Sequence, residues 1–383
     1  MSSHRIRISA HHDFEFLTKI KRSIEYSLVI PEGDIKGLVV YIPGFGDDSG
    51  PYREKFLQHV ADDYSLAGLT VDYHCFFSRP GNGATLSIET GTMNLLRSLT
   101  GLTNNESIDE VLSQACKIKT GPGPLRIPGI IYPKNNDYQN FGVLPALDII
   151  FAINDLFQKF PDIPKIIYAI GSSYGGYIAN LVSKFAPCTL NAVFDNSSWA
   201  SPNLQYVVGH DLGLTELSCN YSSGVVIEAN VLSPWSHLLF MPNAFNRNRS
   251  LIRSFPESHL DVMGKIGKGK TIYRCVHAEN DIIANTDQKL TLIQNMNTKG
   301  FDARITIYSE ADIDGKFIKN MDHGMGLSMR QFFSNSLENI QGRIKDDQRI
   351  DFDFKHTLEF ACESQKYIIT YPGGAQPLCC VRQ

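Results

Sequence analysis

The chain has 383 residues, 43% of them hydrophobic, and a formal net charge of −4. A chain of this length can bury a large core, as one big α/β domain or as two smaller ones. The slightly acidic balance and the dispersed lysines and arginines exclude the basic surface that nucleic-acid binding requires.

The start of the chain, its apolar stretches and its cysteines bear on the compartment. Residues 1–7 lack the apolar core of a signal peptide, and the apolar stretch 143–153 is too short to span a bilayer. The eight cysteines include no C-x-x-C pair, and a chain this long does not need disulfides for stability. We therefore expect a cytoplasmic protein with no membrane span, disulfide, metal site or cofactor.

Strands and helices are expected to alternate along the chain. The predicted strands are residues 5–8, 24–31, 38–42, 69–75, 166–170, 191–194, 271–276 and 304–308. The predicted helices are residues 52–64, 144–160, 177–183, 287–299 and 329–342. This alternation predicts a mostly parallel sheet with helices on both faces. A further strand-like run, residues 366–371, has no partner that the sequence identifies.

Two segments interrupt the alternation. Residues 78–140 are rich in Gly, Asn, Ser and Pro, and residues 197–263 contain both tryptophans, Trp199 and Trp235. Structureless loops of this length are improbable in a compact domain, so both are expected to be insertions that form a cap. The tryptophans could bind substrate there or fill the core of the cap. The expected organisation is N-terminal strands in residues 1–37, a main domain in residues 38–342 and a C-terminal extension in residues 343–383.

A G-x-S-x-G motif lies in the middle of the chain, in the sequence GSSYGG at residues 171–176. It follows a predicted strand and precedes a predicted helix, which is the setting of a nucleophile elbow. The glycines leave room for a strained turn that exposes Ser173, and the helix directs its N-terminal N–H groups toward the reacting centre. An ordinary strand-to-helix turn with no role for the serine is the alternative interpretation.

A nucleophilic serine needs a base, and the base needs an orienting acid. Predicted strand 271–276 leads into His277 and Asp281, and predicted strand 304–308 is followed by Asp322-His323-Gly324. Acid and histidine thus follow the serine on loops after later strands, in the order that suits this architecture. Glu279 and Asp287 are alternative acids, although the His-x-x-x-Asp spacing favours Asp281. His277 is expected to support the loop.

Together these motifs resemble the α/β-hydrolase superfamily, over residues 38–342 outside the insertions. The resemblance implies an α/β-hydrolase fold with Ser173 as nucleophile, Asp281 as acid and His323 as general base. It also implies an oxyanion hole formed by the backbone N–H of Tyr174 and by that of Phe45, in the turn Pro43-Gly44-Phe45-Gly46. Gly46 is the alternative second donor.

Two narrower resemblances accompany this one. The elbow is similar to that of the prolyl-oligopeptidase branch, but only 37 residues precede Leu38, so the large propeller domain of that branch is not expected. Residues 72–75 (Asp-Tyr-His-Cys) and the long insertions resemble an uncharacterised bacterial family of hydrolase-like proteins, encoded among surface-glycan and flagellin-modification genes.

The resemblance implies a serine hydrolase of the esterase kind. We expect it to cleave an acyl ester of a small polar or glycan-related molecule through an acyl-enzyme on Ser173. An O-acyltransferase with the same triad is one alternative, and a non-catalytic binding protein with this fold is another. The oligomeric state is left open by the sequence.

Overall fold

The computed structural model describes residues 1–16, 21–45, 50–222, 224–267, 269–344 and 349–382, and the chain divides into two compact units. Unit 1 comprises residues 1–74, 141–202 and 246–383, and unit 2 comprises residues 75–140 and 203–245. The second insertion is therefore shorter than expected. Residues 246–263 belong to unit 1, and so does Trp199.

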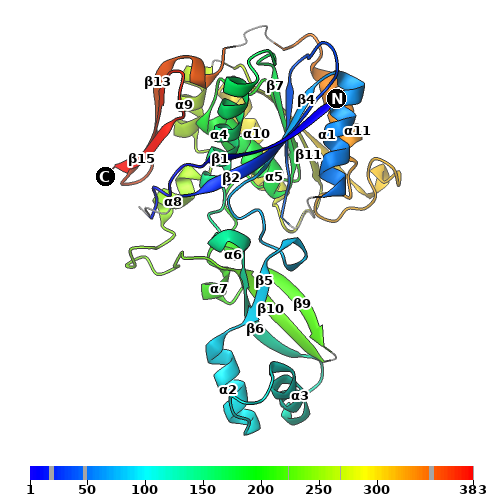
Figure 1. Cartoon of the computed structure of the whole chain (residues 1–383), viewed down its shortest axis with the longest axis vertical. Helices are drawn as coiled ribbons and strands as arrows, with labels where there is room; N and C mark the ends of the chain where they lie inside the picture. Colours follow the sequence, from blue (N-terminus) through cyan, green and yellow to red (C-terminus); the bar gives the residue numbers. More distant parts are fainter. Residues whose placement is uncertain (17–20, 46–49, 223, 268, 345–348, 383) are drawn as a thin grey trace. The chain divides into compact units, whose positions relative to one another are not determined.

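Unit 1 is built on an eight-stranded sheet (Figure 1). In spatial order its strands are β1 (Ser2–Ser9), β2 (Ser23–Ile30), β4 (Ala67–Asp72), β3 (Leu38–Ile42), β7 (Ile167–Ser172), β8 (Ala192–Asn196), β11 (Ile272–Ala278) and β12 (Asp302–Tyr308). β1 and β2 are antiparallel to their neighbours, and all pairings from β4 to β12 are parallel. β3, β4, β7, β8 and β11 are almost entirely buried, because helices cover both faces, whereas the edge strand β12 is mostly half-buried.

One face of this sheet is covered by α1 (Pro51–Tyr64) and α11 (Met329–Ile340), which lie side by side (Figure 1). Phe56 of α1 and Phe333 of α11 share an apolar core with Phe194 of β8. Asp195 points to the opposite face, because side chains alternate along a strand. There it contacts α5 (Tyr174–Phe185) and α10 (Thr286–Thr298), and α4 (Val143–Lys159) packs beside α5. The fold class predicted from the sequence is confirmed.

The C-terminal segment of unit 1 forms a separate antiparallel sheet. Its strands are β13 (Lys355–Ala361), β14 (Lys366–Pro372) and β15 (Leu378–Arg382), with β14 in the centre. β14 contains the predicted strand 366–371, whose partners the sequence did not identify. Tyr371 donates a hydrogen bond to the Phe185 carbonyl at the end of α5, at 2.9 Å. Helices α8 (Arg247–Ile252) and α9 (Glu257–Gly267) complete unit 1, and α9 packs against β13.

Unit 2 has its own sheet and its own core. Its strands are β5 (Thr85–Ile88), β6 (Leu125–Tyr132), β10 (Val225–Val231) and β9 (Leu217–Ser222), in that spatial order. Helices α2 (Thr90–Thr100) and α3 (Ile108–Ile118) pack together against this sheet through an apolar cluster. Two short helices, α6 (Leu204–Val207) and α7 (Gly209–Leu212), precede β9. Across the described ranges, no helix has the length and hydropathy of a bilayer span.

Candidate active site

Ser173 lies at a strained turn between β7 and α5. Its backbone φ is 55° and its ψ is −122°, a conformation that costs a residue with a side chain about 1–3 kcal/mol. The neighbouring glycines make this turn possible. A Cβ on Gly175 would lie 1.9 Å from the Ile42 carbonyl oxygen, and one on Gly171 would lie 2.3 Å from the Gly175 carbonyl carbon. The segment therefore has the backbone geometry of a nucleophile elbow.

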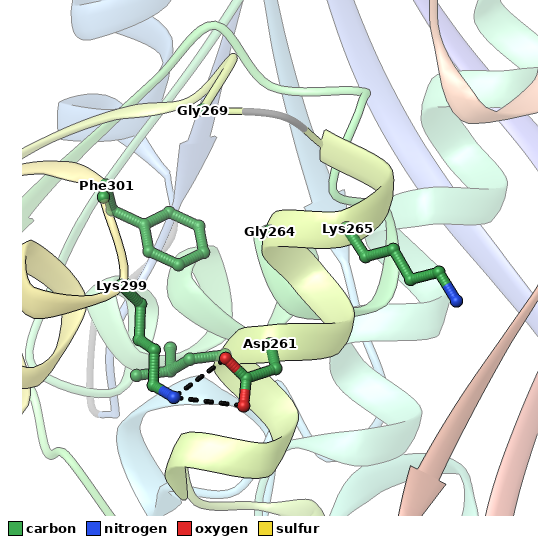
Figure 2. Close-up of a pocket in the computed structure, with 8 residues that line it drawn as sticks. Asp261, Gly264, Lys265, Gly269, Lys299 and Phe301 are labelled. Carbon is green, nitrogen blue, oxygen red and sulfur yellow. Dashed lines mark hydrogen bonds and ion pairs between the residues drawn. The ribbon is translucent and has the colours of Figure 1, made fainter.

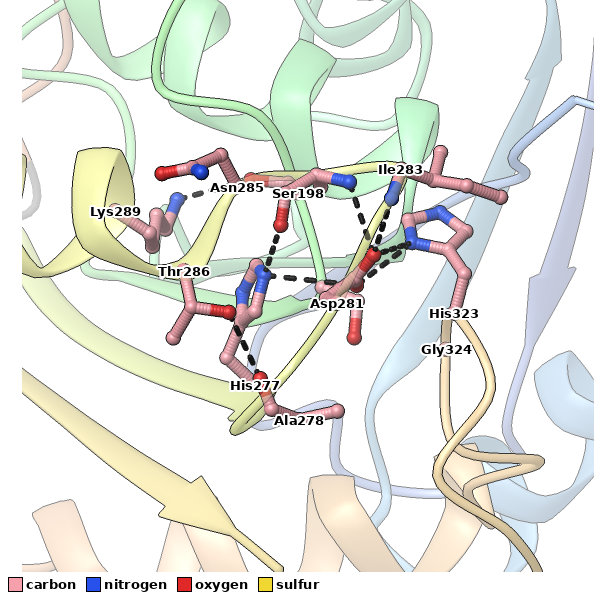
Figure 3. Close-up of polar contacts among 12 residues, drawn as sticks. Ser198, His277, Ala278, Asp281, Ile283, Asn285, Thr286, Lys289, His323 and Gly324 are labelled. Carbon is pink, nitrogen blue, oxygen red and sulfur yellow. Dashed lines mark hydrogen bonds and ion pairs between the residues drawn. The ribbon is translucent and has the colours of Figure 1, made fainter.

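The side chains of Ser173, His323 and Asp281 form a continuous chain of hydrogen bonds within unit 1. His323 Nε2 lies 2.7 Å from Ser173 Oγ, and His323 Nδ1 lies 2.8 Å from Asp281 Oδ2. Figure 3 shows the Asp281 carboxylate against the His323 ring. Because a carboxylate only accepts hydrogen bonds, Nδ1 carries a proton, and in the neutral ring Nε2 accepts the hydroxyl proton of Ser173.

Asp281 is held in place by the loop that carries it. Its Oδ1 accepts the backbone N–H groups of Ile283 and Ala284, each at 2.9 Å. Burial alone would raise the pKa of this carboxyl group. The hydrogen bonds from His323 and from the two N–H groups outweigh burial and hold the pKa of Asp281 below its usual value. Asp281 is therefore ionised beside His323 at neutral pH.

His277 lies buried at the end of β11, beneath this loop (Figure 3). Its Nε2–H donates to the Ala284 carbonyl at 2.7 Å and lies 3.5 Å from Asp281 Oδ2. Burial lowers the pKa of His277, so the ring is neutral and supports the loop. Both alternative acids, Glu279 and Asp287, are exposed to solvent.

The two backbone groups assigned to the oxyanion hole belong to residues whose side chains stack on each other. The rings of Phe45 and Tyr174 lie 3.9 Å apart at an interplanar angle of 11°. Tyr174 is the first residue of α5, where backbone N–H groups point out along the helix axis. Tyr73 donates to the Pro43 carbonyl at 2.7 Å and so fastens the loop that carries Phe45. Gly46, the alternative donor, lies outside the described residues.

The two tryptophans lie in different units. Trp199 belongs to unit 1, where its ring lies 5.8 Å from the His323 ring and its Nε1–H donates to the Ile283 carbonyl at 2.8 Å. Its side chain is 5% exposed. Trp199 therefore packs in the interior, where it contacts His323 and supports the loop that carries Asp281. Trp235 is buried in unit 2, where it donates to the Gln139 carbonyl at 2.9 Å.

A second polar cluster, which no sequence motif indicated, lies beneath the elbow. Asp195 Oδ2 accepts hydrogen bonds from Lys289 of α10, from Asn180 of α5 at 2.7 Å and from Ser198 at 2.7 Å. Burial opposes the charge on both partners, but their attraction lowers the pKa of Asp195 and raises that of Lys289. This buried ion pair ties the elbow helix to the helix that follows the Asp281 loop. Its residues are too far apart in the chain to form a recognisable pattern.

Unit 1 also has a surface hollow of about 340 Å³ between α9 and the end of α10 (Figure 2). Its lining includes two cations, Lys265 and Lys299. Lys299 Nζ already pairs with both carboxylate oxygens of Asp261, at 2.8 and 3.0 Å, and Lys265 points away from the hollow (Figure 2). The hollow therefore does not offer a free positive charge to an anionic ligand.

The sheet topology, the strained turn at Ser173 and the positions of Asp281 and His323 after later strands define an α/β-hydrolase fold. The chain belongs to the family described as "Protein of unknown function (DUF2920)", whose sequence pattern matches residues 4–373. No curated protein matches it.

Solved structures with a similar fold include both peptidases and esterases. The acylaminoacyl peptidase of Pyrococcus horikoshii is 13% identical with a TM-score of 0.47, and the match covers 90% of this chain and 42% of the peptidase. The ferulic acid complex of Est1E from Butyrivibrio proteoclasticus is 12% identical with a TM-score of 0.43, covering 84% and 95% of the two chains. For an S-formylglutathione hydrolase from Agrobacterium tumefaciens the identity is 12% and the TM-score 0.46, covering 90% and 96%. The chain thus spans less than half the length of the Pyrococcus peptidase.

Proposed function

We propose that this protein is a serine hydrolase that cleaves an acyl ester through an acyl-enzyme on Ser173. The observation that carries the proposal is the His323 ring, which bridges Ser173 Oγ at 2.7 Å and Asp281 Oδ2 at 2.8 Å. A serine hydroxyl is a weak nucleophile by itself, and this arrangement supplies both the base and the group that orients the base.

In the first half of the reaction, Ser173 Oγ attacks the ester carbonyl carbon while His323 Nε2 takes the hydroxyl proton. Asp281 holds Nδ1–H and stabilises the positive charge that the ring gains. The backbone N–H groups of Tyr174 and Phe45 donate to the developing oxyanion. Collapse of the tetrahedral intermediate breaks the bond to the alcohol, which leaves with the proton from His323.

In the second half, water attacks the acyl-enzyme and gives a proton to His323 Nε2. The second tetrahedral intermediate releases the carboxylic acid, and Ser173 recovers its proton from His323. A sugar hydroxyl in place of water would give acyl transfer with the same proton movements. We propose a small polar or glycan-related alcohol as the substrate part. The half-buried ring of Phe45 lies against Tyr174, next to the nucleophile, and can pack on an acyl chain or a sugar ring.

An active-site probe tests the mechanism directly. The purified protein is treated with a fluorophosphonate and assayed with p-nitrophenyl acetate, alongside the Ser173→Ala and His323→Ala variants. We expect one adduct, on Ser173, and a loss of several orders of magnitude in rate for either variant, with the double variant little worse. Absence of an adduct, together with a ligand that stabilises the fold and is never turned over, would instead indicate a binding protein.

A comparison of acceptors separates hydrolysis from transfer. The p-nitrophenyl acetate reaction is run with and without candidate sugars, and products are identified by mass spectrometry. We expect hydrolysis, in which the molar amount of acetate released equals the molar amount of nitrophenol. Transfer to a sugar that outruns hydrolysis would contradict the esterase assignment and leave the triad intact.

We also propose that unit 2 acts as a cap that selects the substrate. The chain leaves unit 1 for unit 2 after β4 and after the loop that follows β8. Both exits follow the carboxyl ends of parallel strands, the edge at which open α/β sheets place their binding sites. Replacing both segments of unit 2, residues 75–140 and 203–245, each by a short linker should keep fluorophosphonate labelling of Ser173 and change the ranking of ester substrates. An unchanged ranking would contradict a cap role.

A further inference from the structure

Asn196 contacts both the elbow and the segment that carries His323. It is the last residue of β8 and is 1% exposed. Its backbone carbonyl accepts the N–H of Ser173 at 2.7 Å. Its side-chain Nδ2 donates to the carbonyl oxygen of Gly324 at 3.1 Å and to Ser172 Oγ at 2.9 Å. One residue thus touches the neighbours of the nucleophile and of the base.

The orientation of this side chain follows from its partners. The Gly324 carbonyl can only accept a hydrogen bond, so the amide must present its N–H₂ group there. On the other side, the hydroxyl of Ser197 donates to Asn196 Oδ1 at 3.0 Å. Ser197 has a φ of 54°, a strained value for a residue with a side chain. Its own N–H donates to the Val276 carbonyl of β11 at 2.9 Å.

The histidine loop, residues 309–328, connects β12 to α11 and carries His323. Its path explains why such a contact is needed. His323 follows β12, the edge strand of the sheet, whereas Ser173 follows β7, with β8 and β11 between them. Neighbouring strands lie about 4.8 Å apart, so the loop has to reach about 14 Å across the strand ends. Asn196 stands at the end of β8, next to β7 on this path.

The backbone–backbone hydrogen bonds that the described structure shows next to His323 join residues of the same loop. The Met325 N–H donates to the Asp322 carbonyl at 2.7 Å, and the Leu327 N–H donates to the Gly324 carbonyl at 3.1 Å. These bonds close turns within the loop, but they do not fix its distance from the sheet. The apolar side chain of Met325 is buried in the core, and apolar packing alone is not directional.

We propose that Asn196 is a positioning residue that sets the distance between His323 Nε2 and Ser173 Oγ. The inference rests on the proposed function, because it assigns the residue a role in proton transfer between these two atoms. Without the amide donor, the Gly324 carbonyl loses its link to β8 and the imidazole moves relative to the hydroxyl. A misplacement of about 1 Å can cost about a hundredfold in rate.

The chain offers a matched control for Asn196→Ala. Asn191 is also 1% exposed and also links β7 to β8, through its Oδ1, which accepts the Ile167 N–H at 2.8 Å. It lies at the opposite end of the strands from Ser173. Asn191→Ala therefore removes a comparable buried amide without touching the triad.

The test compares these variants by kcat and KM for p-nitrophenyl acetate, by the rate of fluorophosphonate labelling and by Tm. We expect Asn196→Ala to lower kcat and the labelling rate by about ten- to a hundredfold, with KM within about threefold. Asn191→Ala should lower Tm and leave kcat within about twofold. Asn196→Asp has nearly the same shape but, when ionised, cannot donate to Gly324. It should therefore lose as much rate as the alanine variant, and it replaces that variant if alanine prevents folding.

Two results would overturn the positioning role. One is an Asn196→Asp or Asn196→Ala variant that keeps kcat within twofold of the wild type. The other is an equal loss of kcat in the Asn196 and Asn191 variants, which would indicate a general effect on the fold. Failure of the proposed function itself looks different, because the wild-type protein would then not be labelled on Ser173.

Discussion

Replacing Asp281 by asparagine tests how the triad sets the protonation of its histidine. Oδ1 of Asp281 accepts the N–H groups of Ile283 and Ala284, so the amide oxygen of an asparagine must take this position. The amide N–H₂ then replaces Oδ2 and faces His323 Nδ1, which now lies 2.8 Å from Oδ2. Nδ1 also lies 3.1 Å from Oδ1, but its nearer contact would then set two donors against each other, so we expect the imidazole proton to move from Nδ1 to Nε2.

The consequence for catalysis follows from the second contact of the ring. His323 Nε2 lies 2.7 Å from Ser173 Oγ, and once protonated it can no longer accept the hydroxyl proton. The same change in a serine protease with this arrangement lowers kcat by about 10⁴-fold. We expect a loss of similar size here, which corresponds to about 5.5 kcal/mol in the activation free energy.

The assay is the steady-state hydrolysis of p-nitrophenyl acetate at neutral pH, with Tm measured on the same samples. Asp287→Asn is the control, because Asp287 is an exposed acid in the first turn of α10. It should leave kcat unchanged, while Asp281→Asn lowers kcat with KM nearly constant. If Asp281→Asn kept kcat within tenfold of the wild type in a folded protein, Asp281 would not be the residue that orients His323.

Three further outcomes are expected. Lys289→Met leaves the buried charge of Asp195 without its partner, so the free energy of unfolding in urea should decrease by about 3–5 kcal/mol. Adding Asp195→Asn should restore more than half of this loss, and no recovery would contradict the pairing. Burial lowers the pKa of His11 from 6.5 to about 4, so between these pH values the unfolded chain binds a proton that the folded chain does not. The free energy of unfolding therefore decreases as the pH is lowered through this range, by up to about 1.4 kcal/mol per pH unit. His11→Asn should flatten this slope in urea titrations at pH 4 to 6.5, and an unchanged slope would show that His11 does not contribute. Trp199→Phe removes the hydrogen bond to the acid loop and should lower stability by about 1 kcal/mol and reduce kcat with KM unchanged; a selective rise in KM would indicate substrate binding.

Local patterns in the sequence were sufficient for the elbow and for the order of the chemistry. The glycines around Ser173 are required by the turn itself, because any Cβ at Gly175 collides with the neighbouring strand. The apolar runs of β3, β7 and β11 indicated strands buried on both faces, and strands of that kind form a parallel sheet covered by helices. Loops after the strands of such a sheet meet at one edge, and this is why Asp281 and His323 could be named as candidates from chain order alone.

The tertiary structure decided what depends on contacts between distant segments. Three findings depend on such contacts: Trp199 belongs to unit 1, Asp195 pairs with Lys289, and Asn196 donates to Gly324. No local pattern in the sequence relates the residues of these contacts. The sequence predicts β14 as a strand, but its antiparallel pairing with β13 and β15 is known from the structure. Strand and helix propensity depends on near neighbours, whereas buried hydrogen bonds and ion pairs depend on which segments the completed core brings together. The sequence alone therefore determined the fold class and the candidate nucleophile, base and acid, and the packed structure determined what holds them at 2.7–2.8 Å.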